Sequence, residues 1–284
     1  MINLQRCTDD AMTHFEAIAS SKEESRCMRL LAMKQEVAAA TVEYVIASPE
    51  LQILSPLQVS KQQHDDLLHC YESETKALSE LKARIRASQS ELFYAECQYC
   101  CLGVPRTFDH YLPKRQFPEF AVFLENLLPC CGDCNNLRGE VWRDAQGERK
   151  HLHLYFDVID QSHDVLFADI HMAKLPFASF RLDLSGVGTQ PFFQLLERHF
   201  DALQLLARYK VQAQARLNEH HRTIHEFGKV LRLSKIVRIL QAQFTQDKKD
   251  RGPHDWRVAL LRAVIASPAF VQFALDNSPS VWTQ

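Results

Sequence analysis

The chain has 284 residues, long enough to bury a sizeable core as one large domain or two smaller ones. Its 46% hydrophobic and 24% charged residues exclude a disordered chain, and its eight glycines disfavour a turn-rich all-β fold. The formal net charge of −2 excludes a uniformly basic protein, so any contact with nucleic acid would depend on local positive patches.

Residues 1–20 lack the apolar core of a signal peptide, and no stretch approaches the roughly 20 apolar residues of a membrane-spanning helix. We therefore expect a cytoplasmic protein without a membrane partner. A reducing compartment disfavours disulfides and favours metal ligation as the explanation for clustered cysteines. Six of the nine cysteines fall between residues 97 and 134.

Residues 1–95 are predicted to be helical. Ser21 and Glu24 have the spacing of a capping box, which predicts a helix that runs to about Ile46. Apolar residues three and four apart predict a second helix over about 58–88. The ordinary interpretation of both helices is an amphipathic supporting region.

Two Cys-x-x-Cys pairs follow, Cys97/Cys100 and Cys131/Cys134. Each pair can form a tight turn whose two sulfurs point at one centre, so the pairs together predict a structural zinc site. The further cysteine beside each pair is off this spacing, and we expect it to pack next to the site. Buried free thiols are the alternative, but they would not explain the pairing. A four-cysteine site has no open position, so this zinc would hold the fold and would not catalyse.

Side chains that can bind a hard cation or move a proton accompany the two pairs. Asp109 and Asn135 carry oxygen atoms suited to Mg²⁺, and His110 can take a proton from water near neutral pH. Each residue also has an ordinary explanation. Asp-His is commonly a turn or a surface pair, Asn135 could only cap a helix, and Asn126 could brace a turn. Their combination favours a functional site.

This order of residues resembles the zinc-stapled form of the HNH nuclease family. Members of the family show Cys-x-x-Cys, Asp-His, a central Asn, and Cys-x-x-Cys followed by Asn or His. The matching positions are Cys97/Cys100, Asp109-His110, Asn126, Cys131/Cys134 and Asn135. The Asp-His-Tyr-Leu-Pro-Lys run and the Cys-Asn-x-x-Arg ending are similar to that family as well. Asn135 stands where histidine also occurs, a variation that the family tolerates.

The resemblance implies a ββα-metal fold in which His110 ends the first strand, Asn126 braces the connecting loop and Asn135 lies on the helix. It implies that His110 is the general base, and that Asp109 and Asn135 hold Mg²⁺ or another divalent cation. The substrate would be a nucleic-acid phosphodiester, with DNA favoured. The nearest candidates for phosphate contacts are Lys114, Arg115 and Arg138, although solvated surface charge explains each of them as well.

Residues 151–284 are predicted to mix strands and helices. Strands are expected over 165–170 and 177–184, and residues 185–189 break the structure. Helices are expected from Pro191, over about 218–244, and from near Pro253 to an interruption at Pro268.

Positive charge is not concentrated between the cysteine pairs. Residues 97–150 hold seven Lys or Arg and seven Asp or Glu, so this stretch is neutral before any thiolate is counted. Residues 219–251 hold eight Lys or Arg against four Asp or Glu. A helix there could touch a phosphate backbone, although a solvated helix face is the commoner explanation.

The predicted fold class is therefore α+β and predominantly helical. It comprises a helical region over 1–95, a central ββα-metal HNH module over 96–150, and a strand pair followed by helices over 151–284. We hypothesise that the flanking helices dock a protein partner or a second copy, or position the nuclease, as in effectors of bacterial anti-phage defence. The alternative function is a non-catalytic zinc-stapled module that binds nucleic acid or protein.

Overall fold

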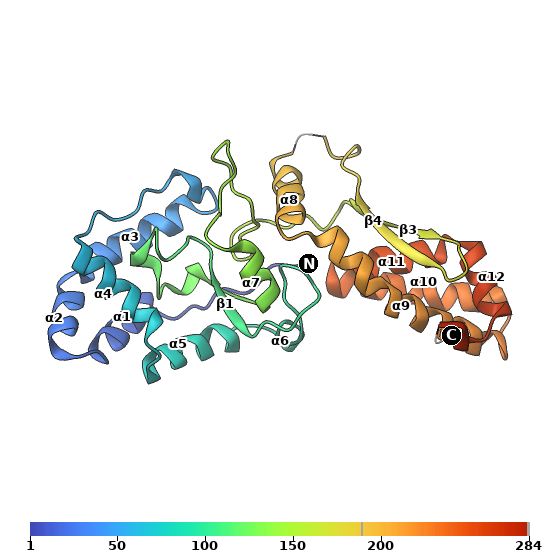
Figure 1. The fold of residues 1–284 in the computed structure, drawn as a ribbon, viewed down its shortest axis with the longest axis horizontal. Coiled ribbons are helices and arrows are strands. Elements are labelled where there is room, and N and C mark those ends of the chain that lie inside the picture. The colour runs from blue at the N-terminus through green and yellow to red at the C-terminus, as the bar shows by residue number, and fades with distance from the viewer. Residues whose placement is uncertain (189, 283–284) are drawn as a thin grey trace. The chain divides into compact units, whose positions relative to one another are not determined.

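The computed structural model describes residues 1–188 and 190–282, and it divides the chain into two units. The N-terminal unit comprises Asn3–Val158, and the C-terminal unit comprises Ile159–Gln284 together with Met1–Ile2. Helices predominate in the described residues, and the strands form two small two-stranded sheets (Figure 1). The class is therefore mixed α+β and mostly helical, as predicted.

The N-terminal unit begins with a series of helices. These are α1 (Ala11–Ser20), α2 (Glu24–Ala32), α3 (Lys34–Ala47), α4 (Lys61–Glu72), α5 (Lys76–Ala87) and α6 (Glu91–Ala95). Polar residues fix where several of them begin: the Asp10 carboxylate accepts a hydrogen bond from the Thr13 backbone N–H at α1. At α4, Ser60 and Gln63 form a reciprocal capping box.

Each of the two long helices predicted before Cys97 is divided in two. The first begins after Glu23, not Ser21, because the Glu23 carboxylate accepts hydrogen bonds from the first backbone N–H groups of α2, and it is interrupted at Met33. The second is interrupted between Glu72 and Lys76, where Thr75 caps α5. Amphipathic spacing continues across both breaks because it reports which face is buried, not where the chain turns.

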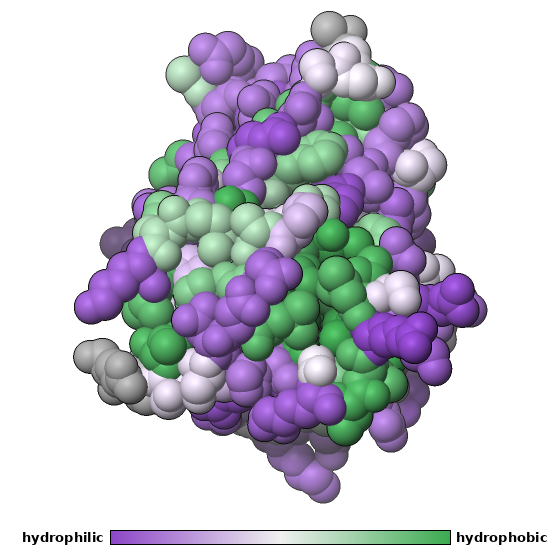
Figure 2. Space-filling view, turned by 90° about the vertical axis from the view of Figure 1, so that its right-hand side faces the viewer, coloured by the Kyte–Doolittle hydropathy of each residue, from purple (hydrophilic) through white to green (hydrophobic). Residues whose placement is uncertain are grey.

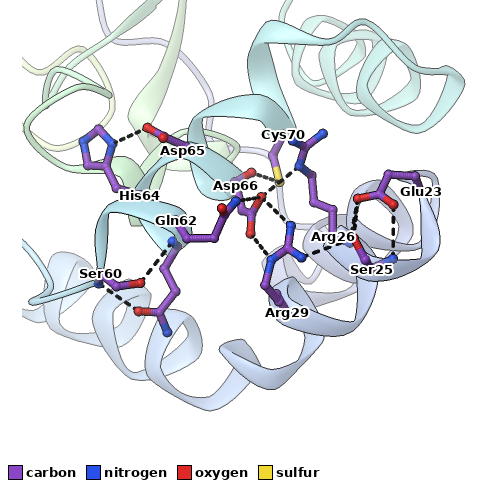
Figure 3. Close-up of polar contacts among 11 residues, drawn as sticks. Glu23, Ser25, Arg26, Arg29, Ser60, Gln62, His64, Asp65, Asp66 and Cys70 are labelled. Carbon is purple, nitrogen blue, oxygen red and sulfur yellow. Dashed lines mark hydrogen bonds and ion pairs between the residues drawn. The ribbon is translucent and has the colours of Figure 1, made fainter.

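A buried carboxylate ties α2 to α4 (Figure 3). Asp66 accepts hydrogen bonds from Arg26 Nε at 2.9 Å, Arg29 Nε at 2.6 Å and Gln62 Nε2 at 3.1 Å. Burial raises the pKa of Asp66, but these hydrogen bonds outweigh burial and lower its pKa to about 2. The cluster fixes α4, the helix that carries Tyr71 to the site described below.

One hydrophobic core joins these helices to two short strands. β1 (Thr107–His110) and β2 (Leu127–Cys130) pair antiparallel, with His110 opposite Leu127. Phe108 and Leu127 are buried in the same cluster as residues of α1, α2, α4 and α5. Residues on both sides of position 95 thus contribute to this core. Helix α7 (Gly132–Arg138) follows β2 directly, and the 3₁₀ turns η2 (Pro118–Phe120) and η3 (Leu124–Asn126) lie between the strands.

The C-terminal unit contains a β-hairpin packed on helices. β3 (Leu166–His171) and β4 (Phe177–Leu182) pair antiparallel, as the sequence predicted. β3 packs on α11 and β4 on α9 (Figure 1). The helices are α8 (Pro191–Ala202), α9 (Leu205–Gly228), α10 (Leu233–Arg251), α11 (Trp256–Ile265) and α12 (Pro268–Asp276). The helix predicted from Pro191 is divided near Gln204, whose φ of 52° lies in the left-handed region.

Over the described residues, no single helix has the length and apolar character needed to cross a bilayer. Helices α11 and α12 meet that criterion only when they are counted together, and they are bent by 80° relative to each other. Trp256, Val258 and Leu260 of α11 are buried, as in a core helix. Figure 2 shows a face of this unit on which apolar surface alternates with polar and charged side chains.

Candidate metal centre and adjoining cavity

Four buried cysteines from the two Cys-x-x-Cys pairs form one group: Cys97, Cys100, Cys131 and Cys134. Their Sγ atoms all lie within 4.8 Å of one another, and the Cys100 and Cys131 sulfurs are 3.7 Å apart. Tetrahedral zinc with Zn–S bonds of about 2.3 Å requires sulfurs about 3.8 Å apart. The donor set therefore fits a zinc ion, and the cysteines at 101 and 130 lie outside it.

Backbone hydrogen bonds fold the loop that carries the first pair. The Cys97 N–H donates to the Gly103 carbonyl at 2.7 Å, and the Cys97 carbonyl accepts from Cys100 N at 3.2 Å. Gly103 lies directly against the second pair, since a Cβ added there would be 2.8 Å from Cys131 Cβ. A residue without a side chain is therefore required where the two cysteine turns meet.

Burial determines what these sulfurs need from a ligand. Desolvation raises the pKa of the Cys97 thiol well above its ordinary value, and the neighbouring sulfurs act in the same direction. Four buried thiolates would repel one another unless a cation compensated their charge. Zn²⁺ prefers thiolate ligands and would supply that compensation, joining the loop around Cys97 to the start of α7.

His110 is the last residue of β1, the strand whose first residue, Thr107, pairs with Cys130 just before the second cysteine pair. Its Nε2 donates a hydrogen bond to the Ala121 carbonyl at 2.9 Å. Because a carbonyl oxygen only accepts, the ring hydrogen lies on Nε2 and the lone pair on Nδ1. The Tyr71 ring packs edge-on against the imidazole, with the ring centroids 4.3 Å apart. Burial lowers the pKa of His110 to about 4, so the imidazole is neutral at pH 7 and is a weaker base than a solvated histidine.

Asn126 holds the loop that positions this histidine. Its Oδ1 accepts from the Leu112 backbone N–H at 2.7 Å, and its Nδ2 donates to the carbonyls of Leu112 at 3.0 Å and Phe120 at 3.2 Å. The side chain is fully buried. Phe120 adjoins Ala121, the hydrogen-bond partner of His110, so Asn126 acts on the histidine through the loop between β1 and β2.

Asp109 points away from His110. Its carboxylate accepts a hydrogen bond from the Tyr99 hydroxyl at 3.2 Å and forms an ion pair with Arg138 of α7. The side chains of Asp109 and Arg138 are only 4% and 2% exposed. Arg138 also donates to the Tyr111 carbonyl at 3.1 Å. Arg138, expected at the nucleic-acid surface, is therefore turned into the interior, where it holds the carboxylate expected to bind a cation.

A cavity of about 580 Å³ opens beside His110. Asn135 of α7 and Lys114 line it, so the structure brings these two predicted site residues together with the histidine. Arg115 is largely exposed and pairs with Glu140 at 3.3 Å. Of the three basic residues singled out from the sequence, Lys114 therefore lines the cavity, Arg115 is exposed at the surface and Arg138 is buried in the interior.

Three further cations line the same cavity, and the sequence interpretation missed them: Lys82, Arg86 and Arg106. Lys82 and Arg86 lie four residues apart on α5, a helix that the sequence analysis interpreted as part of an amphipathic supporting region. Their spacing places them on one face, which was the signal available in the sequence. The cavity wall therefore combines four basic side chains, a neutral imidazole and a carboxamide.

These features define a buried four-cysteine group that could hold a metal, next to a basic cavity. Over 140 residues, or 48% of its length, the chain is 29% identical to protein ea31 of Escherichia phage lambda. The match covers 47% of ea31, so the chain spans about half the length of that relative. No protein-family profile matches the chain. No solved structure matches it either.

Proposed function

We propose that this protein is a zinc-stapled HNH nuclease that hydrolyses nucleic-acid phosphodiester bonds, with His110 as the general base. The observation that carries the proposal is the hydrogen bond from His110 Nε2 to the Ala121 carbonyl. It leaves the Nδ1 lone pair for a proton, on a ring that lines a cavity with four basic side chains.

The local fold supports this proposal. The order β1, β2, α7 is the order that a ββα-metal module would have, with His110 at the end of the first strand and Asn135 on the helix. The two halves of the cysteine group flank the loop that Asn126 braces. Structural support of the catalytic histidine would then come from the zinc, the amide and the surrounding core.

In the proposed reaction, His110 Nδ1 takes a proton from a water molecule, and the water oxygen attacks phosphorus. The bond from phosphorus to the leaving oxygen breaks, and that oxygen finally takes a proton from solvent. Negative charge grows on the phosphoryl oxygens, where basic side chains at the cavity wall stabilise it. Lys114 is the one of these that the sequence singled out.

A divalent cation such as Mg²⁺ would supply further charge neutralisation at the leaving oxygen. The Asn135 carboxamide lines the cavity and suits such a cation. Asp109 suits it by chemistry, but its carboxylate is paired with Arg138, so the two donors implied by the resemblance are not assembled at the cavity. No step of the proposed proton transfer depends on that cation.

The test is a cleavage assay on plasmid DNA, linear DNA and RNA with Mg²⁺ or Mn²⁺. We expect His110→Ala to lower the cleavage rate by about 100-fold or more, because a general base contributes on that order. Zinc content and circular dichroism should match wild type. His163→Ala, at an exposed histidine of the C-terminal unit, is the matched control. Cleavage by His110→Ala at the wild-type rate would refute the proposal.

The second candidate is a non-catalytic zinc module that binds nucleic acid. The ion pair between Asp109 and Arg138 favours it, because this pair withdraws a carboxylate that catalysis by a bound cation would need. Wild-type protein that binds nucleic acid but cuts none of these substrates with either ion would support this candidate over the nuclease.

We also propose, by analogy with the family, that the flanking helices dock a protein partner or a second copy, as in an anti-phage effector. Light scattering after size-exclusion chromatography and a pull-down from the native host test this. A lone monomer with full nuclease activity would contradict it.

A further inference from the structure

We infer that Arg86 and Arg106 form a phosphate clamp, which binds the nucleic-acid backbone next to the bond to be cut. Helix α5 would then belong to the nucleic-acid interface in addition to supporting the fold. The inference rests on the proposed function, since it takes the substrate to be a nucleic-acid strand at the His110 cavity.

Arg86 is held in place by the backbone of Arg106 and by β1. Arg86 Nη2 donates a hydrogen bond to the Arg106 backbone carbonyl at 3.0 Å. The Arg86 guanidinium lies over the Phe108 ring, 4.9 Å from its centroid. Phe108 is two residues before His110 in β1, so the strand that carries the proposed base also positions Arg86. Ordering the guanidinium in advance reduces the entropy lost on binding an anion.

Charge compensation separates these arginines from the two lysines of the cavity. Lys114 pairs with Glu72 at 2.9 Å, and Lys82 pairs with Glu74 at 2.6 Å. Within residues 1–188 and 190–282, no acidic side chain pairs with Arg86 or Arg106. The cavity wall therefore carries two positive charges that the protein itself does not neutralise.

The lining of the cavity selects an anion of a particular kind. It includes no carboxylate, and guanidinium groups present paired donors that match two phosphate oxygens. A nucleic-acid strand carries one phosphate per nucleotide, so a phosphodiester placed at His110 brings a neighbouring phosphate with it. Arg86 and Arg106 line the same cavity as His110 and have no acidic partner among the described residues, so they suit that neighbouring phosphate.

The experiment measures binding without cleavage. Full-length His110→Ala protein, without added divalent cation, is titrated into a fluorescently labelled DNA duplex and a labelled single strand at several NaCl concentrations. We expect Arg86→Gln and Arg106→Gln each to weaken binding by about 3- to 10-fold. Each should also reduce the slope of log affinity against log salt by about one, because one phosphate contact is lost.

The controls separate a local contact from a loss of net charge. Lys76→Gln removes one positive charge at the start of the same helix, where the side chain is 93% exposed and outside the cavity. It should leave the slope unchanged. Arg86→Lys should restore most of the slope, since the charge is kept. Arg106→Gln keeps the test informative if Arg86 variants unfold, because Arg106 is exposed.

Wild-type affinity and slope in a variant that combines Arg86→Gln with Arg106→Gln would overturn the inference. An equal slope change in Lys76→Gln would also overturn it. Competition by inorganic phosphate that matches competition by unlabelled DNA would show a free-phosphate site, and this also overturns it. Cleavage is measured separately, on protein that keeps His110. If this protein does not cleave but the arginine substitutions alter the salt slope of binding, only the nuclease proposal is rejected. If it cleaves but the substitutions leave the slope unaltered, only the clamp is rejected.

Discussion

Asp109 and His110 are adjacent in sequence and face opposite sides of β1. The imidazole lines the basic cavity, while the carboxylate is buried against Arg138 and the Tyr99 hydroxyl. Alternation along a strand produces this separation. The Asp-His pair thus joins the cavity to the interior ion pair, and the two residues should respond differently to substitution.

Loss of the Asp109 carboxylate should destabilise the fold. Asp109→Asn leaves the buried Arg138 guanidinium without its counter-charge, and we expect unfolding free energy to fall by about 3–5 kcal/mol. Asn135→Ala, at a partly exposed position in the cavity, should change stability by less than about 1 kcal/mol while slowing cleavage. Urea denaturation measures both. Equal stabilities for the two variants would show that the Asp109–Arg138 pair does not hold the fold.

Removal of one sulfur from the cysteine group should release the metal. Purified wild-type protein should contain one zinc ion per chain, and Cys131→Ser should contain little, with loss of cooperative unfolding, because zinc binding is coupled to folding. Cys130→Ser is the control: it changes the adjacent buried cysteine, which lies outside the group. Elemental analysis decides between them, and equal zinc loss in both variants would count against the assigned ligand set.

A methyl group at Gly103 should strain the metal centre. Gly103→Ala places a Cβ 2.8 Å from Cys131 Cβ, and we expect a loss of about 1–3 kcal/mol together with weaker zinc retention against a chelator. Gly132→Ala is the matched control, because nothing lies within 4 Å of its added Cβ. If the two alanine variants retain zinc equally, the two cysteine turns are not in close contact.

The Asp66 cluster should make the N-terminal unit sensitive to acid. The folded-state pKa of Asp66 is about 2 against an ordinary 3.8, so its stabilisation is present above about pH 4 and is lost as pH falls toward 2. The loss should reach at most about 2.5 kcal/mol. Thermal unfolding should show a smaller acid dependence in Asp66→Asn. Asp65→Asn, at an exposed neighbour, should keep the wild-type dependence. An unchanged profile in Asp66→Asn would contradict this role.

The spacing of residues in the sequence was sufficient to predict those features that depend on residues close together in the chain. Two Cys-x-x-Cys pairs predicted one four-sulfur group because each short turn directs both sulfurs to one side, and the sulfurs do lie together. The hairpin of β3 and β4 was predicted for a similar reason, since two β-rich segments joined by a short connection pair with each other. The breaks in the helices at Met33 and between Glu72 and Lys76 were not predicted, because the apolar spacing continues through both of them.

The sequence by itself determined the mostly helical α+β class and the four-cysteine group that could hold a metal, because both depend on residue types at short separations. Only the tertiary structure decided that Lys82 and Arg86 face His110, and that Arg138 turns inward to Asp109. A solvated lysine on a helix and one that lines a cavity have the same local sequence. What separates them is the packing of α4 and α5 against β1, which long-range burial decides.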